Sequence, residues 1–260
     1  MSRRLRARFA KTGKVRFVSH RDVARIWERA LRRAGVPIAY TEGFSPRPKL
    51  SFGLALSTGY ESLGEYLDIS LRDGGSSGVD LEQAPTLLTV ALPVGMEVQA
   101  VVDLEPGMPS LQQAVTSCTW HIELSETEAA VATLVDRALA ASELVIARTR
   151  KGQEAVEDVR SGILSLRALG PAADGSTVVE AELATQPRGL RPAELARALH
   201  PATEVRRVVR IHQWTQVGGA RQEVIPLLSV DPDPAREDHP TGPDRSRVAT
   251  LTRTQQARAS

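Results

Sequence analysis

Four arginines near the start of the chain recur at the spacing of one helical turn. They are Arg21, Arg25, Arg29 and Arg32. At about 100° per residue, positions three or four apart share one face of a helix. A guanidinium group binds phosphate through two parallel hydrogen bonds and stays charged at any cellular pH. A repeat of about 5.4 Å is similar to the phosphate spacing of a nucleic-acid strand, so this row predicts RNA binding. A solvated helix face is the alternative, and only Asp22 and Glu28 nearby offset the charge.

A basic and aromatic stretch, TEGFSPRPKLSF at residues 41–52, is the second candidate. Cations interleaved with aromatic rings suit bases that stack above a bound backbone. Phe52 is expected in the core, whereas Phe44 and Arg47 fit either a rigid surface loop or a binding surface. Together with Arg16 before the helix, this stretch completes the predicted nucleic-acid-binding set. Its members outside the helix are Arg16, Tyr40, Phe44, Arg47 and Lys49.

His20 is the one residue here that could do chemistry on RNA. It lies at the predicted helix N-terminus, where the helix dipole favours a neutral imidazole. A neutral imidazole could take a proton from a ribose 2′-hydroxyl, which would make the protein a metal-independent RNA endonuclease. The alternative is a histidine that hydrogen-bonds locally near the cap, and a lone histidine favours that alternative. No cofactor is predicted, and His121, His200 and His212, on predicted strands or loops without acidic or cysteine neighbours at ligand spacing, predict no metal site.

The helix that must position these groups is predicted between Ser19 and Gly35. Ser19 with Asp22 matches the capping box that begins a helix. Gly35, followed by Pro37, ends it. The face opposite the arginines carries an apolar stripe suited to a core. Its members are Val23, Ile26, Trp27, Ala30, Leu31 and Ala34.

The charge of the chain divides sharply along its length. Residues 1–50 hold fourteen Lys and Arg against three Asp and Glu, a net charge of +11, while the remaining residues carry a net of −9. A basic segment on a mildly acidic body is typical of a protein with a phosphate-rich partner. The single cysteine, Cys118, excludes an internal disulfide or a multi-cysteine cluster. With no signal-like N-terminus and no long apolar run, a cytoplasmic protein without membrane contact is expected.

The elements follow the order β-α-β-β-α-β in the first half, the ferredoxin-like arrangement. Strands are predicted at 4–10 and 15–18, then the helix above, and the second half repeats the pattern less cleanly. The predicted fold is therefore α+β, with two tandem ferredoxin-like subdomains in a RAMP-like architecture and a disordered C-terminal tail. The expected boundaries are 1–104, 110–217 and, for linker and tail, 218–260, with a flexible GGSSG loop at 74–78.

From about Arg3 to about Thr215, and most strongly at residues 13–71, the chain resembles the radical SAM-linked, or radical SAM-associated, protein family, the DUF2344 domain. The elements that carry the resemblance are GKVRFVSHRD, RALRRAGVP, YTEGFSPRPKLSF and GEYLDI. Arg21 departs from the family pattern, which has Leu after the Ser-His pair, and adds to the basic face. Family membership implies no established activity. It implies a partnership with a radical SAM protein and a genomic neighbourhood of ribonuclease E/G and ribosomal proteins.

Three functions remain open from the sequence. The first is an accessory protein, not an enzyme on its own, that binds rRNA, tRNA or ribosome-associated RNA alongside a radical SAM partner. The second is an endonuclease that uses His20, on the tandem-domain architecture of the CRISPR RNA-processing enzymes. The third is a scaffold whose basic face docks an acidic surface of a protein partner.

Overall fold

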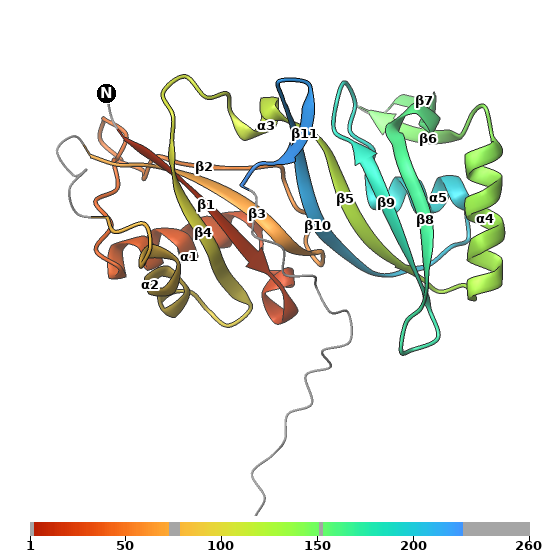
Figure 1. Ribbon diagram of the computed structural model, residues 1–260, viewed down its shortest axis with the longest axis horizontal. Coiled ribbons are helices and arrows are strands. Elements are labelled where there is room, and N and C mark those ends of the chain that lie inside the picture. The colour runs from red at the N-terminus through yellow and green to blue at the C-terminus, as the bar shows by residue number, and fades with distance from the viewer. Residues whose placement is uncertain (1–2, 73–78, 151–152, 226–260) are drawn as a thin grey trace, which may run out of the picture. The chain divides into compact units, whose positions relative to one another are not determined.

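The computed structural model describes residues 3–72, 79–150 and 153–225 of the chain (Figure 1). The predicted loop at 74–78 and, from residue 226 onward, the predicted linker and tail of 218–260 lie outside the described residues. The described part is a mixed α+β fold with one large mixed sheet and a separate two-stranded hairpin. Its strands are β1 (Arg4–Lys11), β2 (Leu50–Phe52), β3 (Glu61–Ser70), β4 (Met96–Leu104), β5 (Val115–Leu124), β6 (Val145–Arg150), β7 (Gln153–Asp158), β8 (Ile163–Pro171), β9 (Thr177–Ala184), β10 (Val205–Val217) and β11 (Ala220–Glu223).

The large sheet follows the order β4-β1-β3-β10-β5-β9-β8. Strand β2 adds to β3, and β11 adds to β10, while β6 and β7 form the separate hairpin. Within the described residues, the only parallel pair is β3 with β10, at Glu61–Val209 and Ser62–Arg210. This short parallel pair joins strands from the two halves of the chain into one sheet.

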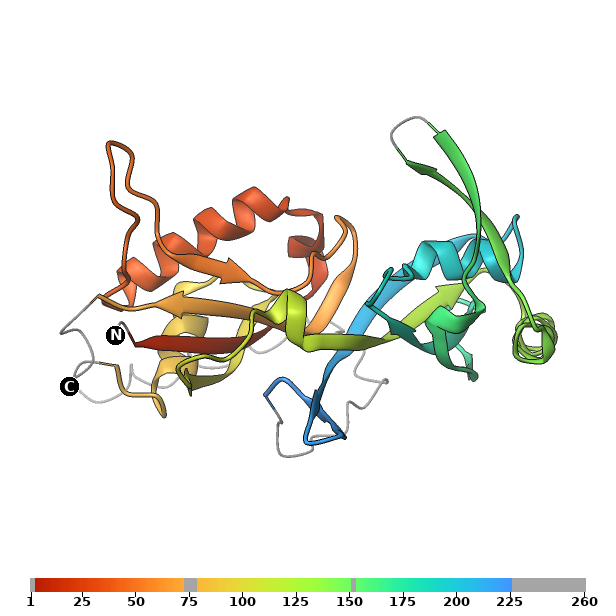
Figure 2. The same cartoon turned by 90° about the horizontal axis from the view of Figure 1, so that it is seen from above.

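Five helices and two short 3-10 turns accompany the sheet in the described part of the chain. They are α1 (His20–Arg33), α2 (Ala84–Ala91), α3 (Leu111–Ala114), α4 (Glu128–Ala140), α5 (Pro192–Leu199), η1 (Gly13–Phe17) and η3 (Arg160–Gly162). Figure 2 shows α1 and α5 on one side of the sheet and β11 on the other. Helices therefore cover one side of the sheet, whereas β11 lies on the other side.

Two hydrophobic clusters fill the side that the helices cover. In the first half, Trp27 of α1 is fully buried and meets Phe9 of β1 edge to face, with 4.9 Å between ring centroids. In the second half, α4 and α5 pack on β5, β8 and β9 around residues such as Val131, Ile122 and Leu195. Because α1 lays its apolar stripe into the first cluster, its opposite face must point to solvent.

The structure confirms the predicted helix and its boundaries. The side chain of Ser19 accepts a hydrogen bond from the Asp22 amide at 3.3 Å, which caps the first turn. Gly35 follows the helix with a φ of 68°, a left-handed conformation that glycine adopts without strain. The local sequence signals therefore determine where the arginine-bearing face begins and ends.

The predicted strand at 15–18 is wrong, since these residues belong to the 3-10 turn η1 and its flank. Two hydrogen bonds engage backbone amides that a β-hairpin would need for strand pairing. The Thr12 amide donates to the Gly95 carbonyl, and the Gly13 amide donates to the carboxylate of Glu61 at 2.7 Å. Within the span 218–260, predicted as linker and tail, the described residues include the strand β11 (Ala220–Glu223).

Candidate nucleic-acid interface

The arginines of α1 lie on the solvent side of the helix, as the helical spacing predicts. All four predicted residues are exposed, and they face away from the buried stripe. They are Arg21, Arg25, Arg29 and Arg32. Eleven helical steps separate the first from the last, so the row spans about 16 Å at 1.5 Å per residue. We call this row, with its exposed guanidinium groups, the arginine ridge.

Acidic side chains compensate only half of the arginine ridge. Arg25 forms an ion pair with Asp22 at 3.2 Å, and Arg32 forms one with Glu28 at 2.8 Å. Arg21 and Arg29 have no hydrogen-bond or ion-pair partner among the described residues. Both observed pairs are exposed to solvent, where such contacts are weak and easily exchanged for another partner. The ridge is therefore available to an anionic ligand.

The Asp22 carboxylate is held in its charged form at the start of the ridge. The hydroxyl of Ser19 donates to it at 2.7 Å, and this bond, together with the charges of Arg25 and Arg21, lowers the pKa of Asp22 below its usual value. A charged carboxylate here stabilises the helix N-terminus. The same group keeps the first turn of α1 in place beneath the ridge.

The second predicted element is a loop that connects α1 to β2. Backbone bonds close it into a narrow hairpin: the Thr41 amide donates to the Arg47 carbonyl, and the Lys49 amide donates to the Ala39 carbonyl, both at 2.8 Å. Phe44 at its tip is as exposed as an isolated side chain, with a relative accessibility of 111%. Tyr40, Arg47 and Lys49 are also exposed. We call residues 40–49 the aromatic loop.

Figure 2 shows the aromatic loop rising beside the C-terminal end of α1, on the same side of the sheet as the helix. The aromatic loop and α1, which carries the arginine ridge, therefore lie on a common side of the sheet. Phe52, by contrast, is partly buried and packs against the first hydrophobic cluster, as predicted. The structure thus separates the aromatic residue that belongs to the core from those that face solvent.

Arg16 differs from the other predicted cations because it is already engaged. Its guanidinium group pairs with buried Glu61 at 3.2 Å and lies 4.7 Å from the ring centroid of Phe17. Glu61 also accepts a hydrogen bond from Arg207 at 2.6 Å. Burial would raise the pKa of Glu61, but the bonds from Arg207, the Gly13 amide and Arg16 outweigh it and lower that pKa. Arg16 therefore helps to hold η1 against β3 and β10.

His20 does not point toward the ridge. Its ring meets Phe52 of β2 edge to face, with 5.0 Å between centroids. By helical geometry Arg25 and Arg29 lie about 140° and 180° around the helix from it. The structure thus places His20 at the flank of α1 that faces β2, and its catalytic role stays a prediction.

Two further arginines lie near the ridge that sequence reasoning missed. Arg33 follows Arg32 directly, is exposed, and could have been found from the helical wheel. Arg72 is far away in sequence, but its amide donates to the carbonyl of Pro37 just after α1, at 2.9 Å. No local signal could reveal Arg72, because the pairing of the end of β3 with the segment after α1 brings it there.

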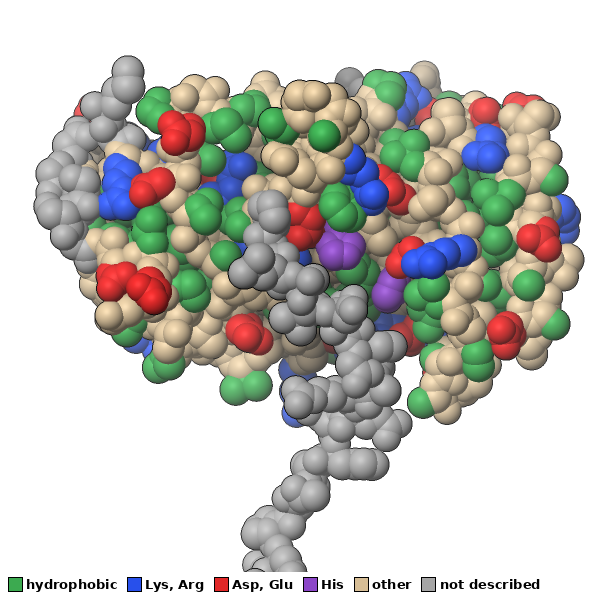
Figure 3. Space-filling model, viewed as in Figure 1, with side chains coloured by type: hydrophobic (Ala, Val, Ile, Leu, Met, Phe, Trp, Pro, Cys, Tyr) green, Lys and Arg blue, Asp and Glu red, His purple; other side chains and the backbone are tan. Residues whose placement is uncertain are grey.

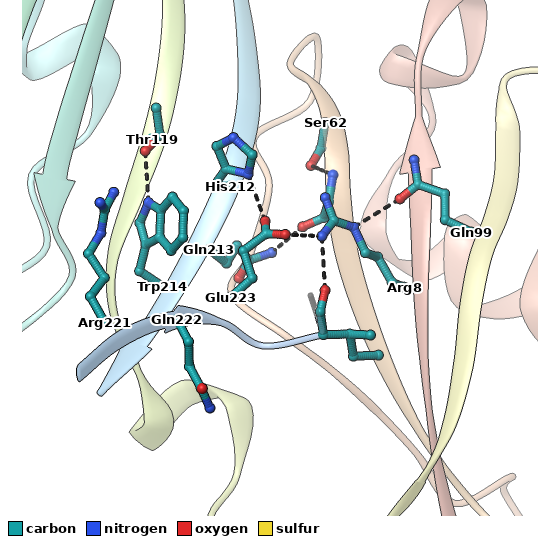
Figure 4. Close-up of polar contacts among 12 residues, drawn as sticks. Arg8, Ser62, Gln99, Thr119, His212, Gln213, Trp214, Arg221, Gln222 and Glu223 are labelled. Carbon is teal, nitrogen blue, oxygen red and sulfur yellow. Dashed lines mark hydrogen bonds and ion pairs between the residues drawn. The ribbon is translucent and has the colours of Figure 1, made fainter. Parts of the chain in front are cut away.

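The side of the sheet that β11 crosses also carries basic, acidic and histidine side chains (Figure 3), and those around β11 are paired with one another. Arg8 of β1 forms an ion pair with Glu223 of β11 and donates to Gln99 of β4 at 3.0 Å. Glu223 also hydrogen-bonds to His212 of β10 at 2.7 Å (Figure 4). Beside this group, the Arg221 guanidinium lies 3.6 Å from the ring centroid of Trp214. These side chains satisfy one another and leave little free charge for a ligand.

Other site types find no support within residues 3–72, 79–150 and 153–225. No group of three or more His, Cys, Asp or Glu residues there could hold a metal ion. In the same residues, no helix is long and apolar enough to cross a membrane. Cys118 is buried, and burial raises the pKa of its thiol to about 11, so it is a poor nucleophile near neutral pH.

A comparison with known protein families gives a match over most of the chain. The family described as "uncharacterized protein conserved in bacteria (DUF2344)" matches residues 4–192, which include α1, the aromatic loop and most of the sheet. No curated protein matches the chain.

Proposed function

Because this chain belongs to the DUF2344 family of uncharacterised bacterial proteins, we propose its function from its geometry: it binds RNA through the arginine ridge and the aromatic loop. The observation that carries the proposal is the exposed face of α1. That helix bears five exposed arginines, against two acidic residues, Asp22 and Glu28. Phosphate groups are the ligands that guanidinium groups bind with the best geometry.

The aromatic loop favours RNA over an acidic protein surface as the partner. An acidic protein would compensate the arginines, but it has no special use for Phe44 and Tyr40 beside Arg47 and Lys49. A nucleic acid uses both kinds of side chain, because its backbone binds the cations and its bases stack on aromatic rings. The combination therefore supports a nucleic-acid ligand.

A duplicated ferredoxin-like architecture is part of the proposal, and strand order supports it. In the first half β4, β1, β3 and β2 are neighbours in that order, and in the second half β10, β5, β9 and β8 are. All of these pairs are antiparallel. In each half, a helix follows the first strand and another precedes the last. This arrangement supports a repeated β-α-β-β-α-β order, to which the second half adds the β6-β7 hairpin between α4 and β8.

The protein partner in this proposal is a radical SAM enzyme, for which the chain would present RNA. With one cysteine, Cys118, the chain cannot supply the three thiolates of a radical SAM cluster, so that chemistry would belong to the partner. The ribosome and a ribonuclease of the E/G class are further proposed partners, since both contain or bind RNA and the family resemblance implies that their genes are neighbours.

Salt dependence of RNA binding tests the proposal directly. Fluorescence anisotropy with a labelled RNA of mixed sequence, in graded potassium chloride, gives the slope of log K against log salt. The four arginines of the ridge alone predict a slope of about −2.8 for a single strand, and each further phosphate contact makes it steeper by about 0.7. The double variant Arg25→Glu plus Arg29→Glu should lower affinity about 100-fold, since each lost charge-assisted contact costs about 1.5 kcal/mol.

The matched control carries the same charge change elsewhere. Arg197 on α5 and Arg206 on β10 are exposed, and the variant Arg197→Glu plus Arg206→Glu should keep affinity within about threefold of the wild type. Equal losses in both variants would mean that only net charge matters, and would contradict the proposal. Capture of an acidic protein, with no RNA bound at any salt concentration, would replace RNA by a protein partner.

A further inference from the structure

Phe44 is the most unusual side chain on the surface, because nothing in the described residues covers it. Its relative accessibility of 111% exceeds that of every other large apolar residue there, with Val94 next at 98%. A fully exposed ring contributes no burial to folding, since the hydrophobic effect scales with the area removed from water. Its presence at the tip of a basic loop is therefore best explained by a partner that covers it.

The loop that carries Phe44 is held in one conformation by its own hydrogen bonds. In addition to the two bonds that close the hairpin, the Arg47 amide donates to the hydroxyl of Thr41 at 2.9 Å. Tyr40 and Pro48 pair as an isolated bridge across the base. Gly43 takes a φ of 116°, a conformation that residues with a side chain rarely adopt. A preorganised ring loses little entropy when a ligand stacks on it.

Exposed cations connect the C-terminal end of α1 to this loop. Arg33 ends the helix, and Arg72 is tied to the chain just beyond it through the carbonyl of Pro37. Two residues before Arg72, the Ser70 amide donates to the carbonyl of Lys49 at 3.1 Å, so the base of the aromatic loop and Arg72 lie on neighbouring backbone segments. Neither Arg33 nor Arg72 has a side-chain partner among the described residues. The basic surface thus continues from the ridge past Arg33 and Arg72 to the loop, whose own acidic residue is the exposed Glu42.

We propose that the ligand of this surface is single-stranded RNA, whose backbone runs along the arginine ridge, passes Arg33 and Arg72, and places an unpaired base on Phe44. This inference rests on the proposed function and names its substrate class. In a duplex, both faces of each internal base are stacked on neighbours, so a ring such as Phe44 can stack only on a base that is unpaired or flipped out. A single strand meets this condition at no cost in base pairs.

The test compares a single-stranded RNA of twelve nucleotides with a blunt duplex of the same sequence, each carrying 2-aminopurine at one internal position. The single strand should bind more tightly, and 2-aminopurine fluorescence should change as the base stacks. Phe44→Ala should weaken single-strand binding roughly tenfold, and should abolish the fluorescence change at the position that contacts Phe44. The slope of log K against log salt should be the same for Phe44→Ala as for the wild type, because the substitution removes no charge.

Further variants separate stacking from charge. Phe44→Trp should keep both affinity and the fluorescence change, since indole also stacks on bases. Phe17→Ala removes another exposed phenylalanine, 62% accessible, and should leave single-strand affinity within about twofold. Arg33→Ala plus Arg72→Ala should reduce the magnitude of the salt slope by about 1.4, the value for two phosphate contacts.

The outcomes distinguish this inference from the proposed function. If RNA binds through Arg25 and Arg29, but the duplex binds as tightly or Phe44→Ala has no effect, the single-strand inference fails and RNA binding stands. If neither RNA binds at low salt, both fail. If Phe44→Ala impairs capture of a protein partner while RNA binding is unchanged, Phe44 belongs to a protein interface and the inference is overturned.

Discussion

Two arginine–aspartate pairs in this protein show how differently one chemical contact can be used. Arg6 on β1 and Asp68 on β3 are buried and joined by two parallel hydrogen bonds of 2.6 and 2.9 Å. Arg25 and Asp22 on α1 are more than half exposed and share one contact of 3.2 Å. Burial makes the first pair part of the fold, whereas solvent leaves the second free to exchange partners.

Only part of the positive charge of the N-terminal segment is available to a partner. Arg6 and Arg8 belong to the count that gives residues 1–50 a net charge of +11, but Asp68 and Glu223 from later in the chain neutralise them. The positive charge that remains available to a partner is concentrated on α1 and the aromatic loop. Net charge along the sequence therefore exaggerates the binding surface, and exposure in the structure locates it.

The largest expected effect comes from breaking the buried pair. Asp68→Asn leaves the Arg6 guanidinium buried without a counter-charge, and should lower the free energy of unfolding by about 3–5 kcal/mol. Asp22→Asn, which alters the matching exposed carboxylate, should change it far less. Urea unfolding at pH 7, followed by circular dichroism, measures both.

A second variant checks the cause of that loss. Replacing both partners, with Arg6→Met and Asp68→Leu, should recover most of the stability, because no charge is then left buried without a partner. If Asp68→Asn and Asp22→Asn cost the same, the buried pair would not differ from the exposed one, and the comparison would fail.

An intermediate effect is expected at Glu223, and it should depend on pH. Burial would raise the pKa of Glu223, but its bonds to His212 and Arg8 outweigh burial and lower that pKa below its usual value near 4.5. A lowered carboxyl pKa stabilises the fold above about pH 4.5, and this stabilisation is lost as pH falls through the folded-state pKa. Glu223→Gln should therefore cost about 2 kcal/mol at pH 7 and progressively less below pH 4.5.

Urea unfolding of wild type and Glu223→Gln between pH 7 and pH 3 measures this difference. Asp22→Asn is the control, because its carboxyl pKa is also lowered but the group is exposed. A difference between wild type and Glu223→Gln that stays constant down to pH 3 would show that Glu223 does not act through its charge.

Local patterns determined what could be predicted from the sequence. The cap at Ser19, the apolar stripe around Trp27 and the glycine after the helix are all contained in one segment, so α1 and its arginine face were predictable. Strand β11 was not, because ARQE has no apolar alternation. It is held by Glu223, whose partner Arg8 lies at the other end of the described chain.

Long-range contacts also distinguish residues of the predicted site that the sequence alone treats alike. Arg16 has the same residue type as the ridge arginines, but Glu61 reaches it from β3 and draws it into the fold. Arg72 was missed for the opposite reason, since strand pairing brings a distant exposed cation next to α1. In both cases the arginine side chain could bind phosphate, but a contact with a residue distant in sequence determines whether it lies on the binding surface.

The smallest effect on stability, and the sharpest test of the comparison, is expected at Arg32. Its pair with Glu28 is exposed and four residues apart on one helix, so Arg32→Ala should lower the free energy of unfolding by only about 0.3–0.5 kcal/mol. Single-stranded RNA affinity should nevertheless fall about tenfold, because one charge-assisted phosphate contact of about 1.5 kcal/mol is lost. Asp68→Asn should show the reverse pattern, with a large loss of stability and, at temperatures where it remains folded, nearly unchanged affinity. Unfolding and anisotropy measurements on the same two variants compare the effects directly. If Arg32→Ala cost as much stability as affinity, the exposed arginines would be part of the fold, and the distinction between the two kinds of pair would not hold.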